Sequence, residues 1–121
     1  MSSPLDRPRL EVGHVAESLV VRVAGCDNVD EETIPFIREQ LLDLADRPGP
    51  TRLLLDLGGV RFLSSSGLGL LVGLHKRLRA GGGSLAVCGV NPDVREVFEV
   101  TRLDQVLDLR TEGPPEDARA S

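Results

Sequence analysis

The chain has 121 residues, a typical length for one domain, and 40% of them are hydrophobic. A net charge of −5, with no Trp or Tyr and only three Phe, argues against a protein that binds nucleic-acid phosphates or stacks bases. No apolar run reaches the roughly 18 residues of a membrane span, and the first residues lack the apolar core of a signal peptide, so we expect no membrane insertion and a cytoplasmic location.

The first part of the chain predicts two strands followed by a helix. Residues 1–8 contain two prolines and no periodicity, which indicates a flexible N-terminal arm. Residues 9–25 are dense in alternating β-branched side chains, typical of two strands with a turn at Glu17 and Ser18. A polar loop follows, and Thr33 can then cap a helix. The apolar stripe of this helix consists of Ile34, Ile37, Leu41 and Leu44.

Two almost unbroken apolar runs mark the centre of the predicted sheet. Leu53–Leu57 and Leu85–Val90 have the composition of strands that are buried on both faces. Between them lies an apolar helix from about Ser65 to Arg79. The basic cluster His75–Arg79 near its end suits the negative pole of a helix dipole better than it suits a nucleic-acid site.

The last predicted elements are a helix and a short strand. Asn91 can cap the helix, and Pro92 suits its first position, where an N–H would have no helical partner. We expect Val94, Val97 and Phe98 to face the core. Residues 105–109 then predict a strand, and the polar, Pro-rich residues 110–121 predict a disordered tail.

Alternating strands and helices predict a single α/β domain over residues 9–109. The order ββαβαβαβ implies a mainly parallel or mixed sheet of about five strands with helices packed on it. Cys26 and Cys88 lie far apart in the sequence and, with only two histidines, make a poor set of metal ligands. We therefore expect two reduced thiols, no metal and no cofactor.

The stretch LSSSGLGLLVG, residues 63–73, lies where the chain is predicted to pass from a strand into a helix. In α/β sheets, functional sites are commonly found at such positions. It lacks the GxSxG spacing of a nucleophile elbow, the GxxxxGK[ST] of a phosphate-binding loop and the GxGxxG of a dinucleotide site. These spacings argue against an enzyme and against a nucleotide site.

A purely structural role accounts for part of this stretch. Ser64 would be the N-cap, and Ser65 and Ser66 would be polar residues of the first turn. Gly69 and Gly73 lie four residues apart on one helical face, and we expect them to let the helix backbone press against a neighbouring element. On this interpretation Gly73→Leu overpacks the contact and lowers the melting temperature.

The motifs LLLDL, SSSGL and NPDVREVFEVTRLDQVL together resemble the anti-sigma factor antagonists of the STAS domain family. In that family an apolar strand ending in Asp leads through a short turn to Asp-Ser-Ser-Gly-Leu at a helix start. Here Asp56 ends the strand, and residues 64–68 occupy the motif. Gly25 and Thr33 fit the upstream Gly-Glu-Leu-Asp loop and helix, with about two more loop residues. The resemblance covers residues 9–109 and implies a STAS-type fold.

The resemblance also implies roles for individual residues. Ser65 matches the phosphorylated serine, and Ser66 matches the serine after it. Ser64 stands where the family has aspartate, so the carboxylate beside the acceptor is replaced by a hydroxyl that could compete as an acceptor. Cys26 stands where the family's loop has glutamate. The implied partner-binding residues come from the loop and the helix start: Asp27, Asn28, Ser64, Ser65, Ser66, Gly67 and Leu68.

By the same resemblance, the protein would regulate transcription by binding other proteins. Unphosphorylated, it would bind an anti-sigma factor of the serine kinase type and free a sigma factor. Phosphorylation of Ser65 by that kinase would release it, and a PP2C-type phosphatase would reset it. The alternatives are a STAS scaffold subunit of a stressosome-type or transporter complex, and a small-molecule or nucleotide-binding STAS domain. A pull-down that recovers an anti-sigma kinase, scaffold subunits or no protein distinguishes them.

Overall fold

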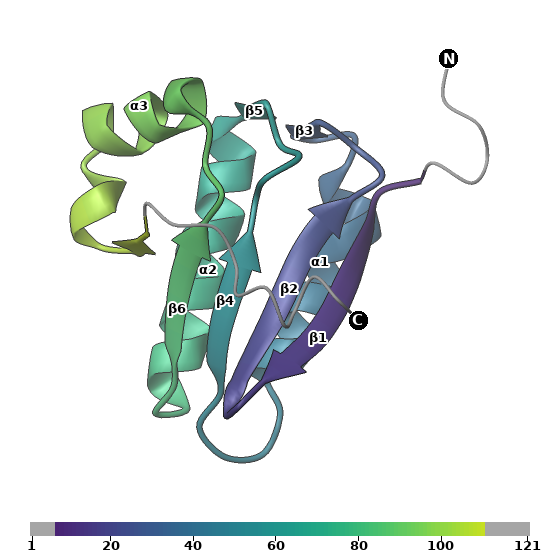
Figure 1. Ribbon diagram of the computed structural model, residues 1–121, viewed down its shortest axis with the longest axis vertical. Coiled ribbons are helices and arrows are strands. Elements are labelled where there is room, and N and C mark those ends of the chain that lie inside the picture. The colour runs from purple at the N-terminus through teal and green to yellow at the C-terminus, as the bar shows by residue number, and fades with distance from the viewer. Residues whose placement is uncertain (1–6, 111–121) are drawn as a thin grey trace.

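The computed structural model describes residues 7–110, which form a five-stranded sheet, a separate two-stranded sheet and three α-helices (Figure 1). The expected arm and tail lie almost wholly outside the described residues. The elements in chain order are β1 (Arg9–Val15), β2 (Ser18–Ala24), β3 (Asn28–Val29), α1 (Ile34–Ala45), β4 (Arg52–Asp56), β5 (Phe62–Leu63), α2 (Ser65–Ala80), β6 (Ser84–Cys88), α3 (Pro92–Val100), the 3-10 helix η1 (Leu103–Gln105) and β7 (Asp108–Leu109).

The large sheet is mixed, with the strand order β1-β2-β4-β6-β7. β1 and β2 form an antiparallel hairpin, whereas β2, β4, β6 and β7 run parallel to one another. The two apolar runs of the sequence therefore lie inside the sheet, as predicted. Parallel neighbours need long crossovers, and the crossovers here contain the three α-helices.

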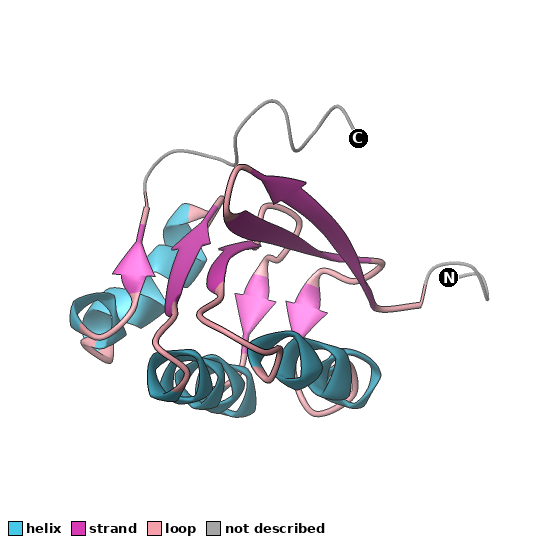
Figure 2. Ribbon diagram, turned by 90° about the horizontal axis from the view of Figure 1, so that it is seen from below, coloured by secondary structure: helices cyan, strands magenta, loops and turns pink. Residues whose placement is uncertain are grey.

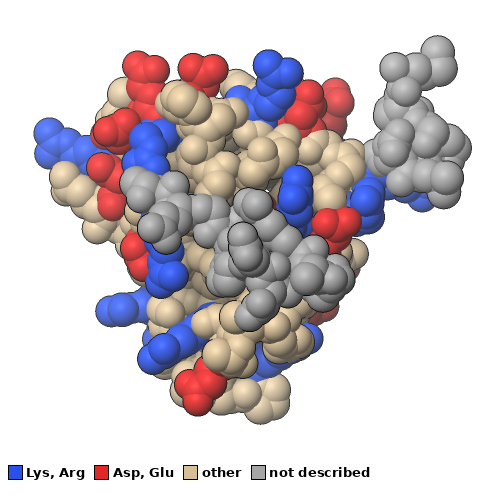
Figure 3. Space-filling view, in the orientation of Figure 1, with Lys and Arg blue, Asp and Glu red and all other residues tan. Residues whose placement is uncertain are grey.

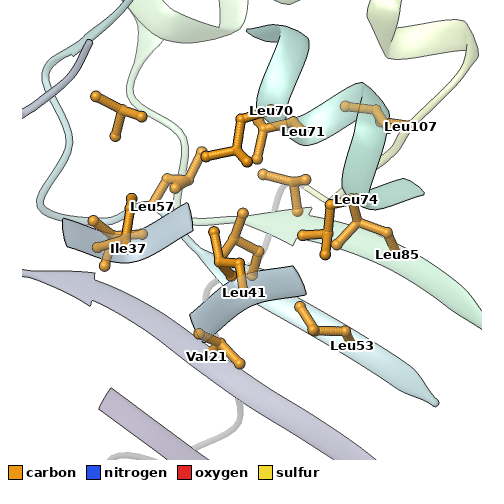
Figure 4. Close-up of a cluster of buried hydrophobic side chains, with 14 of the residues drawn as sticks. Val21, Ile37, Leu41, Leu53, Leu57, Leu70, Leu71, Leu74, Leu85 and Leu107 are labelled. Carbon is orange, nitrogen blue, oxygen red and sulfur yellow. The ribbon is translucent and has the colours of Figure 1, made fainter. Parts of the chain in front are cut away.

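The main core lies between the sheet and its helices. Helices α1 and α2 lie side by side against one face of the sheet (Figure 2). Leucines of both helices meet the inward side chains of β2, β4 and β6, as Figure 4 shows. α3 adds Val94 and Phe98 to the same cluster, while Val97 is only half-buried. On the other face of the sheet, a smaller cluster consists of Val20, Leu54, Ala86 and Cys88.

Three short elements were not predicted from the sequence. β3 pairs in parallel with β5 in the separate two-stranded sheet, and η1 occupies residues 103–105. Because η1 continues the chain after α3, only Asp108 and Leu109 remain for the last strand, which was expected over residues 105–109. The first turn lies at Ala16 and Glu17, one residue earlier than predicted. Strands of two residues are too short for an alternating pattern to reveal them.

The helix caps were predicted correctly for α2 and α3 and wrongly for α1. Ser64 and Asn91 each accept a backbone N–H of the first turn. Thr33 precedes α1, but its backbone is already helical at φ −95° and ψ −31°, and its side chain makes no capping bond. A capping side chain needs an extended backbone to reach back to the first turn. The Thr33 hydroxyl instead donates to the Asn28 carbonyl at 2.9 Å.

The surface mixes charges of both signs. On the face seen in Figure 3, outside the grey atoms, acidic and basic side chains are interspersed. Near the end of α2, Arg77 pairs with Asp46 at 2.8 Å, so part of the basic cluster is a solvated structural contact. Cys26 and Cys88 are not joined in a disulfide. Within residues 7–110, no helix is long and apolar enough to span a membrane, and no cluster of three potential metal ligands occurs.

Candidate functional site

The small β3–β5 sheet brings the two predicted parts of the site together. Asn28 is the register partner of Phe62, and the Asp27 carbonyl accepts N–H groups from Arg61 and Phe62 at 2.7 and 3.2 Å. The Ser64 N–H donates to the Val29 carbonyl at 3.0 Å. The loop after β2 is thus fastened to the segment that leads into α2, and the predicted loop residues lie beside the serine motif.

Ser64 is the N-cap of α2. Its backbone is extended, at φ −77° and ψ 172°, and its Oγ accepts the Gly67 N–H at 3.1 Å. The Leu68 N–H donates to the Ser64 carbonyl at 2.9 Å, which closes the first turn of the helix. The Ser64 side chain is half-buried and its oxygen is engaged in the cap.

Ser65 and Ser66 are both exposed but differ in their contacts. Among the described residues, the Ser65 hydroxyl makes no hydrogen bond. The Ser66 hydroxyl donates to Glu31 Oε1 at 2.6 Å, across a sequence separation of 35 residues. The three consecutive serines therefore have three environments: a cap, an unbonded hydroxyl and a hydroxyl held by a carboxylate.

Glu31 is a site residue that the sequence reasoning missed. It lies in the loop between β3 and α1, and the hydrogen bond from Ser66 lowers the pKa of its carboxyl group below the ordinary value. Nothing in the loop sequence CDNVDEE distinguishes Glu31 from Glu32. Only the folded arrangement of the loop against α2 makes the distinction.

Gly67 is the glycine that lets α2 approach its neighbours closely. A Cβ at this position would lie 2.7 Å from the Val29 carbonyl oxygen and 2.8 Å from Leu63 Cδ1. Real Cβ atoms essentially never come this close, and because the nearer atom belongs to the backbone of β3, a side chain here would force that strand or the helix to shift. Gly67 therefore fixes how the helix start is seated against the small sheet.

The expectation that Gly69 and Gly73 serve close packing was wrong. A Cβ at either position would meet nothing within 4 Å outside its own helix backbone. The two glycines line a groove between α1 and α2. Their missing side chains leave a groove of about 350 Å³, lined by Ile34, Arg38, Leu42, Ser66, Gly69, Leu70, Gly73 and Arg77.

An exposed aromatic ring and a protonated thiol complete the surroundings of the serines. Phe62, two residues before Ser64, exposes 54% of its surface, while its neighbour Leu63 is buried. Cys26, at the start of the loop, is half-buried. Burial raises the pKa of its thiol, and the nearby carboxylates of Asp27 and Asp30 raise it further. The thiol therefore stays protonated at neutral pH and is a poor nucleophile.

Asp56 has a structural role at the end of β4. Its side chain is the buried acidic group of the described residues, with 4% exposure, and its Oδ1 accepts the Gly58 N–H at 2.8 Å. This bond shapes the turn that leads from β4 towards β5 and the serine motif. Asp56 is thus buried and engaged in the turn.

Comparison with known proteins gives one consistent result. The STAS domain family matches residues 9–114. An anti-sigma F factor antagonist of Paenibacillus polymyxa is 31% identical over 101 residues, which are 84% of this chain and 85% of that protein. An anti-sigma-B factor antagonist of Bacillus subtilis is 29% identical over 100 residues, or 83% of this chain and 88% of that protein. A solved STAS domain protein from Planctomyces limnophilus matches with a TM-score of 0.81 at 31% identity, over 92% of this chain and 96% of that one.

Proposed function

This chain belongs to the STAS domain family, and we propose that it is an anti-sigma factor antagonist whose binding is switched by phosphorylation of Ser65. Unphosphorylated, it binds an anti-sigma factor of the serine kinase type in the cytoplasm and frees the sigma factor held there. The kinase phosphorylates Ser65 and the complex dissociates, until a PP2C-type phosphatase removes the phosphate. The kinase and the phosphatase supply the chemistry, and the chain itself supplies a binding surface.

The observation that carries the proposal is the position of Ser65. It is the first residue of a 16-residue helix, it is exposed, and its hydroxyl is unbonded within the described part of the chain. A kinase can reach such a hydroxyl without unfolding the helix start. Ser64, by contrast, would have to give up the N-cap before it could react.

The helix start is also a place where a phosphate is tolerated by the fold. The first N–H groups of a helix have no partner within it, and the helix dipole places partial positive charge there. The first turn of α2 contains no acidic residue that would repel an added phosphate from within the helix. Phosphorylation adds about −1.5 to −2 charges, which these N–H groups can hold without rearrangement of the domain.

The same phosphate is not tolerated by a docked partner. Asp27, Asn28, Phe62 and Ser65 are exposed in one region, where the loop, β5 and the start of α2 meet. A partner that covers this region removes water from whatever Ser65 carries. An unpaired dianion taken out of water costs several kcal/mol, which is enough to weaken binding by orders of magnitude.

Site-resolved labelling tests the proposal. The protein is incubated with a cognate serine kinase and Mg-ATP, and phosphopeptides are mapped by mass spectrometry. We expect one phosphate, on Ser65, and we expect Ser65→Ala to abolish labelling while it leaves the circular dichroism spectrum unchanged. Label that persists in Ser65→Ala but disappears in Ser64→Ala would contradict the assignment, because the acceptor would then be Ser64.

The two alternatives from the sequence are decided by partner capture. With the unphosphorylated chain as bait, recovery of an anti-sigma kinase supports the proposal. Recovery of scaffold subunits points to the stressosome-type or transporter role, and binding of a small molecule without a protein partner points to a ligand-binding STAS domain.

A further inference from the structure

We propose that Glu31 selects the phosphoacceptor by holding the hydroxyl of Ser66, a role that rests on the proposed function. Two exposed serines, Ser65 and Ser66, stand next to each other at the start of α2, and a kinase docked there meets both. The hydrogen bond between Ser66 Oγ and Glu31 Oε1, at 2.6 Å, distinguishes them.

The loop that carries Glu31 is fixed on both sides of the residue. Asp30 Oδ1 accepts the N–H of Glu32 at 3.0 Å and that of Thr33 at 3.3 Å. The Thr33 hydroxyl accepts the Asp30 N–H at 3.0 Å and donates to the Asn28 carbonyl at 2.9 Å. The unexpected behaviour of Thr33, which does not cap α1, thus has a consequence here. The loop backbone holds Glu31 opposite the first turn of α2.

The chemistry of phosphoryl transfer explains why this contact protects Ser66. Transfer forms a bond between the serine Oγ and the γ-phosphorus of ATP, breaks the bond from that phosphorus to the bridging oxygen of ADP, and passes the hydroxyl proton to a base of the kinase. The Ser66 proton is directed at Glu31 instead. A phosphate on Ser66 would also place its charge in contact with the Glu31 carboxylate, which destabilises that product.

The N-cap role distinguishes Ser64 from Ser65. The Ser64 oxygen accepts the Gly67 N–H and is half-buried, so it is not presented to a kinase. The first turn of α2 has no acidic residue of its own, and Glu31 brings a carboxylate to it from the loop between β3 and α1. The cap and the carboxylate together leave Ser65 as the open hydroxyl.

The test compares Glu31→Ala and Glu31→Gln with Glu32→Ala as a matched control. Glu32 is the neighbouring exposed glutamate, and its carboxylate makes no hydrogen bond within the described residues. Each variant of the 121-residue chain is labelled with a cognate serine kinase and Mg-ATP, and the fraction of phosphate on Ser66 is measured by phosphopeptide mass spectrometry. In the wild type and Glu32→Ala we expect almost all phosphate on Ser65.

We expect Glu31→Ala to raise the Ser66 fraction about tenfold, the change expected when one hydrogen bond to a charged group is lost. Glu31→Gln removes the charge but keeps an acceptor oxygen, so its fraction lies between those of the wild type and Glu31→Ala. A Ser66 fraction in Glu31→Ala equal to that in Glu32→Ala overturns the inference while the labelled wild type still supports the proposed function.

A second measurement does not depend on the kinase. The Glu31 carboxyl is titrated by NMR in the wild type and in Ser66→Ala, and we expect its pKa to be higher in the variant. Identical titration curves overturn the inference whatever the labelling shows. A wild type that no cognate serine kinase labels overturns the proposed function and the selection together, even where the titration shows the hydrogen bond.

Discussion

Helices α2 and α3 begin in similar ways but carry different charges. Each is preceded by a polar residue with an extended backbone whose side chain accepts the N–H of the third helical residue. For Ser64 the acceptor distance to Gly67 is 3.1 Å, and for Asn91 the distance to Val94 is 2.8 Å. α3 then has Asp93 in its first turn, a permanent negative charge that complements the helix dipole, whereas α2 has no acidic residue there.

The start of α3 has a built-in acidic residue, whereas the start of α2 would gain a charge only by phosphorylation, in our proposal. Asp93 is part of the sequence of α3, and a carboxylate at a helix start is favourable at neutral pH. The start of α2 has exposed hydroxyls at Ser65 and Ser66 and no acidic residue of its own, and in our proposal a kinase adds the negative charge to Ser65. The same helix geometry thus serves stability in α3 and, in our proposal, regulation in α2.

Substitution of the third residue of α2 is expected to change the free energy of unfolding most. α3 has a buried valine there, Val94, whereas Gly67 of α2 has no room for a Cβ beside the Val29 carbonyl. We expect Gly67→Ala to lower the free energy of unfolding by about 1–3 kcal/mol, the usual cost of overpacking. Urea denaturation measures it, with Gly73→Ala as the matched control. A loss of the same size in both variants would contradict the seating role of Gly67.

The caps rank next. We expect Ser64→Ala and Asn91→Ala each to cost about 0.5–2 kcal/mol of the free energy of unfolding. Asn91→Ala should cost more, because Asn91 Nδ2 also donates to the Val60 carbonyl at 3.1 Å. Both values come from urea denaturation at neutral pH. An unchanged stability in Ser64→Ala would show that its cap bond contributes nothing in solution.

Substitution of the two glycines of α2 that line the groove is expected to have a smaller effect on stability, and of the opposite sign. Gly69 and Gly73 have space for a Cβ, and glycine in a helix interior is less favourable than alanine. We expect Gly69→Ala and Gly73→Ala each to raise the free energy of unfolding by about 0.5–1 kcal/mol. Thermal denaturation of the two variants and of their double mutant measures it. A lower melting temperature in either single variant would restore the close-packing role that the structure contradicts.

The smallest expected effect is a pH dependence at the Glu31 contact. The folded-state pKa of Glu31 lies below its unfolded value, so its contribution to stability is present above the unfolded pKa and is lost as the pH falls through the folded pKa. We expect Ser66→Ala to be slightly less stable than the wild type at neutral pH and equally stable in acid. A stability difference that persists unchanged into acid would assign it to something other than the carboxylate.

Local patterns in the sequence were sufficient for most of the fold. The apolar runs that became β4 and β6 are long enough to predict buried strands, and Ser64 and Asn91 precede their helices with the residue types that cap. The serine motif could likewise be placed at a helix start. These features depend on a few neighbouring residues, which a sequence displays directly.

The features that were missed depend on contacts between distant segments. β3 and β5 have two residues each and exist because Asn28 and Phe62 meet across the small sheet. The bond from Ser66 to Glu31 joins the first turn of α2 to the loop between β3 and α1, and no spacing rule predicts it. Gly69 and Gly73 do lie four residues apart in one helix. That spacing does not reveal whether their shared face packs against a neighbour or borders a groove.

In our proposal, phosphate on Ser65 at the start of α2 weakens partner binding. Calorimetric titration of the anti-sigma partner with the phosphorylated and the unphosphorylated chain tests this central claim most directly. We predict that phosphate on Ser65 weakens binding by about 100-fold or more, since a buried, unpaired dianion is disfavoured by several kcal/mol. Ser65→Ala should bind like the unphosphorylated wild type, and Ser65→Asp should fall in between because it adds one charge. Equal affinity of the phosphorylated and unphosphorylated chains would contradict the account.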